Sequence, residues 1–195
     1  MAVAVIGTGN IGSTLGRAFA RAGMEVRLGS RDPDAAAGAS GDSGARVLTV
    51  GAALNGADVV VIAVPGSRVA EFLREHATAL DGCLIVDAAN RVGEPTLNSS
   101  ADATVLVPGA RYARAFNSYG WEVFAQPEFD GERADLLYTA EEGDQAVVEQ
   151  LIEAVGLRPV YVGPGQADVL DTVLRLMFPL FPRFGRRTAL RLLTG

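Results

Sequence analysis

The chain has 195 residues, 49% of them hydrophobic, and a formal net charge of -6 at pH 7. A chain of this length and composition can bury a sizeable core, so we expect a single domain over residues 1–195. The acidic balance argues against a nucleic-acid partner and against a basic membrane-binding surface, because both need clustered positive charge.

All 17 basic residues are arginine, which excludes Schiff-base chemistry and general-base catalysis by lysine. The single cysteine, Cys83, lies in an apolar run, so no internal disulfide can form and a buried structural thiol is expected. The N-terminus lacks a basic leader, and no apolar stretch approaches the ~20 residues of a membrane helix. We therefore expect a cytoplasmic protein without a membrane partner.

The first half of the chain alternates short apolar segments with helical patterns. Residues 3–6 (VAVI) are typical of a strand covered on both faces, and residues 10–22 carry apolar side chains at helical spacing. Between residues 69 and 80 a second set of apolar side chains falls on one helical face. Further strands are predicted over residues 24–28, 46–50, 58–64 and 84–86. This alternation predicts a Rossmann-type, doubly wound α/β fold, with a mostly parallel sheet and helices on both faces.

The second half of the chain continues the alternation. An amphipathic helix is predicted over residues 144–155. Three more strands are predicted, over residues 112–116, 136–138 and 159–162. Because they alternate with helices in the same way, we expect them to extend the sheet, which would then be large.

The end of the chain, residues 166–195, is predicted to be a small helical appendage. An apolar helix begins near Gln166 and is expected to break at Pro179 and Pro182, because proline removes a helical hydrogen bond. Its apolar side chains fit either the protein core or the seam of a homodimer. A basic tail follows, with Arg183, Arg186, Arg187 and Arg191. These arginines could meet a coenzyme phosphate, but we favour a solvated tail.

Residues 7–12 (GTGNIG) form a G-x-G-x-x-G pattern that follows the first strand and opens the first helix. In this setting the pattern is a dinucleotide-binding fingerprint. The first glycine permits the tight turn, the second lets the backbone approach a pyrophosphate, and the third lets the helix lie close to the strand. The N-terminus of the helix attracts the phosphates. Gly7, Gly9 and Gly12 are therefore predicted cofactor-binding residues.

The second strand ends in Gly-Ser-Arg, beside the expected position of the adenosine ribose. An acidic residue there would accept hydrogen bonds from a free 2′-hydroxyl. Ser30 and Arg31 instead suit a 2′-phosphate, and Thr8 can lean in from the first loop. A charge-assisted hydrogen bond of about 1.5–3 kcal/mol gives roughly tenfold to hundredfold discrimination. The sequence predicts NADP rather than NAD, with a solvated Arg31, its field weakened by Asp32 and Asp34, as the alternative.

Several short motifs together resemble one family. GTGNIG, GSRDP after the second strand, AVP at residues 63–65, VDAAN at residues 86–90 and RAFNSYGW at residues 114–121 look like the NADP oxidoreductases that use the deazaflavin coenzyme F-420. The cytoplasmic reductase domains of membrane ferric reductases are similar. The resemblance runs along nearly the whole chain, with its specific motifs concentrated in the first half.

This resemblance implies a role for individual residues. Those expected to hold the 2′-phosphate are Thr8, Ser30 and Arg31. Those expected under the pyrophosphate are Asn10 and Ile11. Those expected to flank the nicotinamide are Ala63, Val64, Pro65 and the segment around Trp121. Those expected to border the second coenzyme are Asn90 and Asn117.

Hydride transfer between a nicotinamide and a deazaflavin needs two stacked rings with reacting carbons about 3–3.5 Å apart, so positioning supplies most of the catalysis. We accordingly assign no catalytic residue and no metal site. His76, the only histidine, is interpreted as structural. Asp87 either points into the crevice at the strand ends or caps the following loop.

Three further side chains have open interpretations. Tyr119 and Trp121 could form an aromatic wall for a flat cofactor or close the core beneath the last strands. Asp171 lies among apolar helical neighbours and can pair with Arg175 at i+4. None of these residues is assigned a catalytic role.

The leading hypothesis is an NADP(H)-dependent oxidoreductase that transfers hydride between NADPH and coenzyme F-420 or a flavin-type acceptor. The chain has little room for a separate substrate domain, so the site must be shallow, which favours a large flat partner. One alternative is an NADPH-dependent ferric or flavin reductase. Another is a non-catalytic NADP-binding sensor module.

Overall fold

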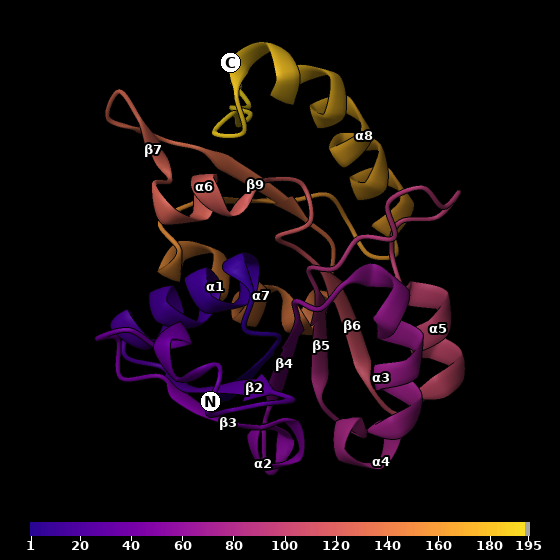
Figure 1. Ribbon diagram of the computed structural model, residues 1–195. Helices are drawn as coiled ribbons and strands as arrows, with labels where there is room; N and C mark the ends of the chain where they lie inside the picture. Colours follow the sequence, from indigo (N-terminus) through magenta and orange to yellow (C-terminus); the bar gives the residue numbers. More distant parts are fainter. Residues whose placement is uncertain (194–195) are drawn as a thin grey trace.

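The computed structural model describes residues 1–193. Its centre is a six-stranded parallel sheet in the order β3-β2-β1-β4-β5-β6 (Figure 1). The strands are β1 (Ala2–Ile6), β2 (Glu25–Ser30), β3 (Arg46–Thr49), β4 (Val59–Ile62), β5 (Leu84–Asp87) and β6 (Arg111–Arg114). The strand order reverses at β1, and the helices lie on both faces, so the predicted Rossmann-type fold is confirmed.

The helices form two groups, one on each face of the sheet. Figure 1 shows α1, α6 and α7 together on one side and α3, α4 and α5 on the other. The helices are α1 (Asn10–Arg21), α2 (Val50–Leu54), α3 (Val69–Glu75), α4 (Ala77–Leu80), α5 (Ser100–Leu106), α6 (Trp121–Ala125), α7 (Gln145–Ala154) and α8 (Ala167–Phe184). The expected continuous helix near residues 69–80 is interrupted at His76, whose backbone angles (φ -115°, ψ 16°) are not helical.

The alternation of side chains along β1 explains why both faces are covered. Val3 and Val5 pack into the core with Leu15 and Phe19 of α1, whereas Ala4 and Ile6 pack into the core beneath α3 on the other face. Side chains of a strand point alternately to the two faces, so a wholly apolar strand needs helices on both. Cys83 lies in the second of these cores, and the prediction of a buried thiol is confirmed.

Of the three strands predicted in the second half of the chain, only the first joins the main sheet, as β6. The strands β9 (Asp135–Tyr138) and β10 (Arg158–Tyr161) form a separate parallel pair, and β7 (Glu128–Phe129) pairs with β8 (Glu132–Arg133). A single antiparallel bridge, Arg114 to Thr139, joins this part to β6. The predicted strand over residues 112–116 ends early because Phe116 has a φ of 61°, which turns the chain away from the sheet.

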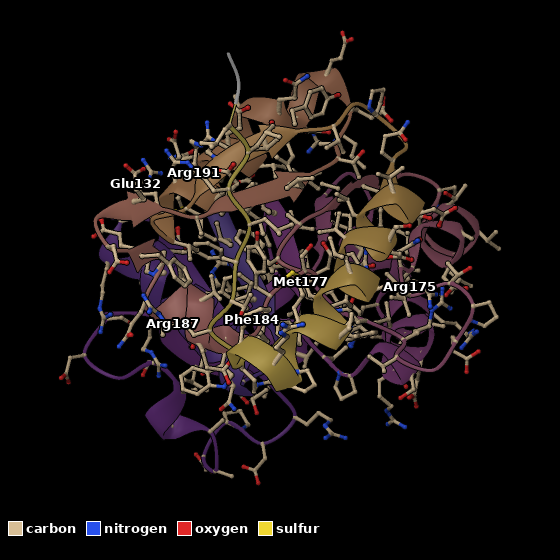
Figure 2. The ribbon with its side chains drawn as sticks, turned by 90° about the horizontal axis from the view of Figure 1, so that it is seen from above. Glu132, Arg175, Met177, Phe184, Arg187 and Arg191 are labelled. Atoms are coloured by element: carbon tan, nitrogen blue, oxygen red, sulfur yellow. The ribbon has the colours of Figure 1, made fainter. Side chains whose placement is uncertain are left out.

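The C-terminal helix α8 is also longer than predicted, because it continues through Pro179 and Pro182 to Phe184. Both prolines are on the exposed side of the helix, where water can bind the carbonyl groups that they leave without a helical donor. Met177, buried, and Arg175, exposed, lie on opposite sides of α8 in Figure 2. Neither α8 nor any other helix within residues 1–193 is long and apolar enough to cross a membrane.

The apolar residues of α8 divide between two faces. Leu170, Leu174 and Met177 are buried, which agrees with the expectation of core packing. Val169 and Leu176 are exposed on the outer face and are available for a homodimer interface. That interface stays a prediction.

The C-terminal segment after α8 returns along β9 and is fastened there by Tyr119. The Tyr119 hydroxyl donates to the carbonyl of Asp135 at 2.6 Å and accepts from the Leu190 amide at 3.1 Å. Burial raises the pKa of Tyr119 to about 12. Burial also raises the pKa of Tyr138 and Tyr112 above the ordinary value.

We therefore expect stability to fall at alkaline pH because of these tyrosines. The folded state holds the neutral phenol of Tyr119, so its contribution, about 2–3 kcal/mol, is complete below about pH 10 and is lost as the pH rises towards about 12. The chain has no lysine, which leaves tyrosine as the main titrating group. Urea unfolding at several pH values measures the slope. Tyr119→Phe should be less stable at pH 8 and lose less stability on going to pH 12; an unchanged slope in this variant contradicts the assignment.

Candidate functional site

The glycine turn between β1 and α1 contains glycines that the fold itself requires. Gly7 has a φ of +112°, and a Cβ there would lie 2.4 Å from the carbonyl oxygen of Ala63. A Cβ at Gly12 would lie 1.9 Å from the carbonyl oxygen of Gly7. Real Cβ atoms cannot approach so closely, so these two glycines let β1, α1 and the segment after β4 pack together.

Gly9 differs from these glycines because neither its backbone conformation nor the packing around it requires a glycine. Its backbone is in an ordinary extended conformation (φ -72°, ψ -174°). A Cβ there would meet no atom of the described residues within 4 Å. Gly9 is also exposed at the N-terminus of α1, where backbone amides attract anions. The open space above Gly9 is what a pyrophosphate needs.

A first cavity of about 960 Å³ opens beside Gly9, at the carboxyl ends of β1, β2 and β4. This edge of the sheet, next to the reversal of strand order, is where such folds bind ligands. The cavity brings together eight of the predicted cofactor-binding residues: Gly7, Thr8, Gly9, Ser30, Arg31, Ala63, Val64 and Pro65.

Of the two arginines that line this cavity, Arg31 is the one without an acidic partner among the described residues. Within residues 1–193 its guanidinium makes no ion pair, whereas Arg68, which also lines the cavity, pairs with Glu71 at 3.1 Å. The neighbouring Asp32 carboxylate is turned to the backbone, where it accepts a hydrogen bond from the Ala35 amide at 3.1 Å. The Ser30 hydroxyl donates to the Asp32 carbonyl at 2.9 Å. Arg31 is therefore free to bind an anion.

One wall of the first cavity was not predicted from the sequence; it comes from α3 and the residues at its two ends. Its residues are Ser67, Arg68, Glu71, Phe72, Glu75 and His76. His76 was interpreted as structural; it packs against the Phe72 ring at 5.1 Å between centroids but also lines the cavity. The spacing of these residues could have predicted this wall, because residues 68, 71, 72, 75 and 76 fall on one helical face directly after the AVP motif.

A second cavity of about 320 Å³ lies on the α8 side of the glycine turn. Three predicted residues line it, namely Ile11, Asn90 and Asn117. Leu174, Phe178 and Phe181 of α8 form the opposite wall. Of the predicted residues in the described chain, Asn10, Gly12 and Trp121 line neither cavity. Trp121 is partly exposed at the start of α6, next to Gly120, which does line the second cavity.

Comparison with known proteins agrees with this geometry. Residues 2–91 match the family described as NADP oxidoreductase coenzyme F420-dependent. The predicted resemblance is confirmed over these residues. The match contains the glycine turn, Ser30 and Arg31, the AVP segment and Asn90, and it supports an NADP-dependent oxidoreductase.

Solved structures with the same fold cover most or all of this chain. A protein from Arthrobacter sp. FB24, named provisionally as an F420-dependent NADP-reductase, shares 23% identity over the full length of both chains with a TM-score of 0.85. The hypothetical protein SMa0349 from Sinorhizobium meliloti shares 28% identity, with 86% and 87% of the two chains covered and a TM-score of 0.71. A reductive aminase from Aspergillus terreus in complex with NADPH shares 21% identity, with a TM-score of 0.69 and 93% of this chain but 61% of that chain covered.

The two asparagines of the second cavity are held in place by hydrogen bonds. The Asn90 amide nitrogen donates to the Asn117 carbonyl at 2.9 Å, and its oxygen accepts from Arg114 at 2.8 Å. The Asn117 amide nitrogen donates to the Leu170 carbonyl of α8 at 3.3 Å. These contacts connect the loop after β5 to the loop after β6, and the loop after β6 to α8.

The second cavity offers no side chain among its described lining residues that is placed to act as a general acid. Tyr119 and Arg186 are its ionisable side chains. The Tyr119 hydroxyl already donates to the Asp135 carbonyl, and Arg186 pairs with Glu122 at 2.7 Å. The remaining lining is mostly apolar or aromatic. In residues 1–193 no group of three or more His, Cys, Asp or Glu side chains is placed to hold a metal ion.

The acidic residues near this cavity have structural partners. Asp87 caps the loop that follows β5, accepting from the Ala89 and Ser99 amides at 3.0 Å each. The predicted pairing of Asp171 with Arg175 is wrong: Asp171 pairs with Arg114 at 2.7 Å. Arg175 instead donates to backbone carbonyls of residues 94 and 95.

The four arginines of the basic tail are exposed, as we favoured, but three of them are held by partners on the protein. Arg186 pairs with Glu122, Arg187 lies 4.3 Å above the Phe129 ring, and Arg191 pairs with Glu132 at 2.9 Å. Figure 2 shows Arg191 beside Glu132 and Arg187 on the same side of the molecule. These arginines fasten the C-terminal segment to residues 122–133, because that stretch supplies carboxylates, an aromatic face and free carbonyls.

Proposed function

We propose that NADPH binds in the first cavity and that a flat deazaflavin or flavin-type acceptor, foremost coenzyme F420, binds in the second. Bound NADPH supplies the hydride, and the protein aligns the two rings beside the glycine turn, which borders both cavities. The open space at Gly9 and the unpaired guanidinium of Arg31 support the cofactor assignment. The family match over residues 2–91 supports the reaction class.

In this proposal each cavity residue has a binding role. The residues that would hold the 2′-phosphate are Thr8, Ser30 and Arg31. The residues that would lie along the pyrophosphate are Gly7, Gly9, Asn10, Ile11 and Gly12. The residues that would flank the nicotinamide are Ala63, Val64, Pro65 and Trp121, whose side chain would have to turn inward. The residues that would border the acceptor are Asn90 and Asn117.

The observation that carries the acceptor assignment is the chemistry of the second cavity. Reduction of a simple carbonyl needs a proton donor beside the developing alkoxide. The described lining provides none, because the Tyr119 hydroxyl already donates to a backbone carbonyl and the Arg186 guanidinium does not give up its proton. Hydride transfer to a deazaflavin depends mainly on the distance and alignment of the two rings. The apolar and aromatic walls contributed by Phe116 and by α8 suit a flat ring.

The test is an absorbance assay of the purified protein with NADPH and oxidised coenzyme F420. NADH replaces NADPH in one parallel reaction, and a free flavin or a ferric complex replaces F420 in others. Fast bleaching of F420 with NADPH, and slow bleaching with NADH, is the expected result. Turnover only with flavin or ferric iron would assign the protein as a flavin or ferric reductase. Saturable NADPH binding without turnover on any acceptor would favour a binding module.

A further inference from the structure

Arg114, the last residue of β6, is the largest fully buried side chain among residues 1–193. One of its terminal nitrogens donates to Asp87 at 3.1 Å and to the Ala89 carbonyl at 2.9 Å. The other donates to Asn90 at 2.8 Å and to Asp171 at 2.7 Å. One guanidinium therefore binds four acceptors that come from two separate parts of the chain.

These acceptors belong to the two walls of the second cavity. Ala88 and Asn90 line the cavity from the loop after β5, and Leu174 and Phe178 line it from α8. Asp171 is on α8, one turn before Leu174. Arg114 lies behind the cavity and connects its walls, while its own side chain is not part of the lining.

The loop that Arg114 holds also touches the wall of the first cavity. A Cβ at Gly66 would lie 2.3 Å from the carbonyl oxygen of Asn90, so the two backbones are in direct contact there. Gly66 follows Pro65, which lines the first cavity. The Asn90 segment thus touches both sites, because its backbone packs against Gly66 beside the first cavity and Asn90 itself lines the second.

The carboxylates of this cluster are well satisfied, whereas the Nε atom of Arg114 is buried without a hydrogen-bond partner among the described residues. The second oxygen of Asp171 accepts from the backbone amides of Leu97 and Asn98 at 2.8 and 3.0 Å, and from the Asn98 side chain at 2.8 Å. Asp87 also accepts from Tyr112 at 2.8 Å. Buried ion pairs often stabilise a protein no more than apolar residues of similar size would. Such a buried cluster can instead fix the geometry of the segments that it joins.

We propose that Arg114 is a positioning residue that sets the alignment of the two cavities, by fixing the Asn90 segment to α8. This inference rests on the proposed function, because alignment matters only if substrates in the two cavities react with each other. A displacement of about 1 Å between reacting groups can lower a rate about a hundredfold, so a loose Asn90 segment would affect the reaction more than the binding of NADPH.

The test replaces Arg114 with lysine, which keeps the charge but cannot donate to four separated acceptors. The matched control is Arg111→Lys. Arg111 is on the same strand and pairs with the buried Asp144 at 2.6 Å, but it lines neither cavity among the described residues. In Arg114→Lys we expect the Kd for NADPH to stay within about twofold, the KM for F420 to rise about tenfold and kcat to fall about tenfold. Arg111→Lys should resemble the wild type.

A second readout does not depend on turnover. Hydrogen exchange followed by mass spectrometry should show faster exchange in residues 88–99 and in the first turns of α8 for Arg114→Lys, with β1 and α1 unchanged. If Arg114→Lys does not fold, Asp171→Asn is measured in its place, because it keeps the Arg114–Asp87 pair and should give the same pattern.

The outcomes separate this inference from the proposed function. Failure of the wild type to reduce F420 overturns the proposed acceptor, and the exchange data then decide alone whether Arg114 connects the two walls. Unchanged exchange in residues 88–99 and α8 overturns the inference whatever the acceptor. It is also overturned if NADPH affinity and F420 kinetics decline in parallel, since that pattern indicates general destabilisation.

Discussion

Replacing Gly9 with valine is expected to lower the affinity for NADPH at least about a hundredfold while the free energy of unfolding changes by about 1 kcal/mol or less. Valine readily adopts the extended backbone conformation of Gly9. A Cβ at this position would have no atom of the described residues within 4 Å. The new methyl groups would instead occupy the space proposed for the pyrophosphate and block the amides at the start of α1. Isothermal titration with NADPH and urea unfolding measure the two quantities.

The control for this variant is Gly7→Ala, where the opposite pattern is expected. A Cβ at Gly7 would lie 2.4 Å from the Ala63 carbonyl oxygen, and the φ of +112° is unfavourable for alanine. We expect a loss of more than about 2 kcal/mol of folding stability. A Gly9→Val protein that binds NADPH as tightly as the wild type would remove the glycine turn from the proposed cofactor site.

Replacing Arg31 with alanine is expected to weaken NADPH binding roughly tenfold to hundredfold and to leave NADH binding within about twofold. The guanidinium lines the first cavity and makes no ion pair with any described residue. A charge-assisted hydrogen bond to the 2′-phosphate is worth about 1.5–3 kcal/mol, and NADH has no such phosphate to lose. Titration of each protein with both cofactors at one ionic strength gives the comparison.

Arg21→Ala is the matched control, since it makes the same change in net charge at the exposed end of α1, away from the residues that line the first cavity. Its affinity for either cofactor should be that of the wild type. Equal losses for NADPH and NADH in Arg31→Ala would mean that Arg31 acts on a part common to both cofactors, and the assignment to the 2′-phosphate would be wrong.

The first cavity was largely predictable because its signals are local. Gly7 and Gly9 follow a wholly apolar strand, and Ser30 and Arg31 stand at the end of the next one, so the parallel sheet necessarily brings them to the same edge. The exception is the wall from α3. His76 occupies an apolar helical face in the sequence, but the helix is interrupted at that residue and the ring reaches the cavity rim.

The second cavity was predictable only in part, because its walls meet through contacts between distant segments. Asn90 and Asn117 were expected there, but the wall from α8 depends on the Arg114–Asp171 pair, whose partners are 57 residues apart. A local i+4 argument assigned Asp171 to Arg175, which points the other way. Pro179 and Pro182 predicted a break in α8, yet on the exposed side of a packed helix proline is tolerated.

The central claim is that hydride passes directly from a nicotinamide in the first cavity to a flat ring in the second. The most direct measurement is a single turnover with NADPH that carries deuterium at the hydride-donating carbon, with oxidised F420 as acceptor and mass spectrometry of the reduced coenzyme. The account predicts that carbon-bound deuterium appears in reduced F420. Reduced F420 without deuterium, or no reduction although both molecules bind, would contradict it.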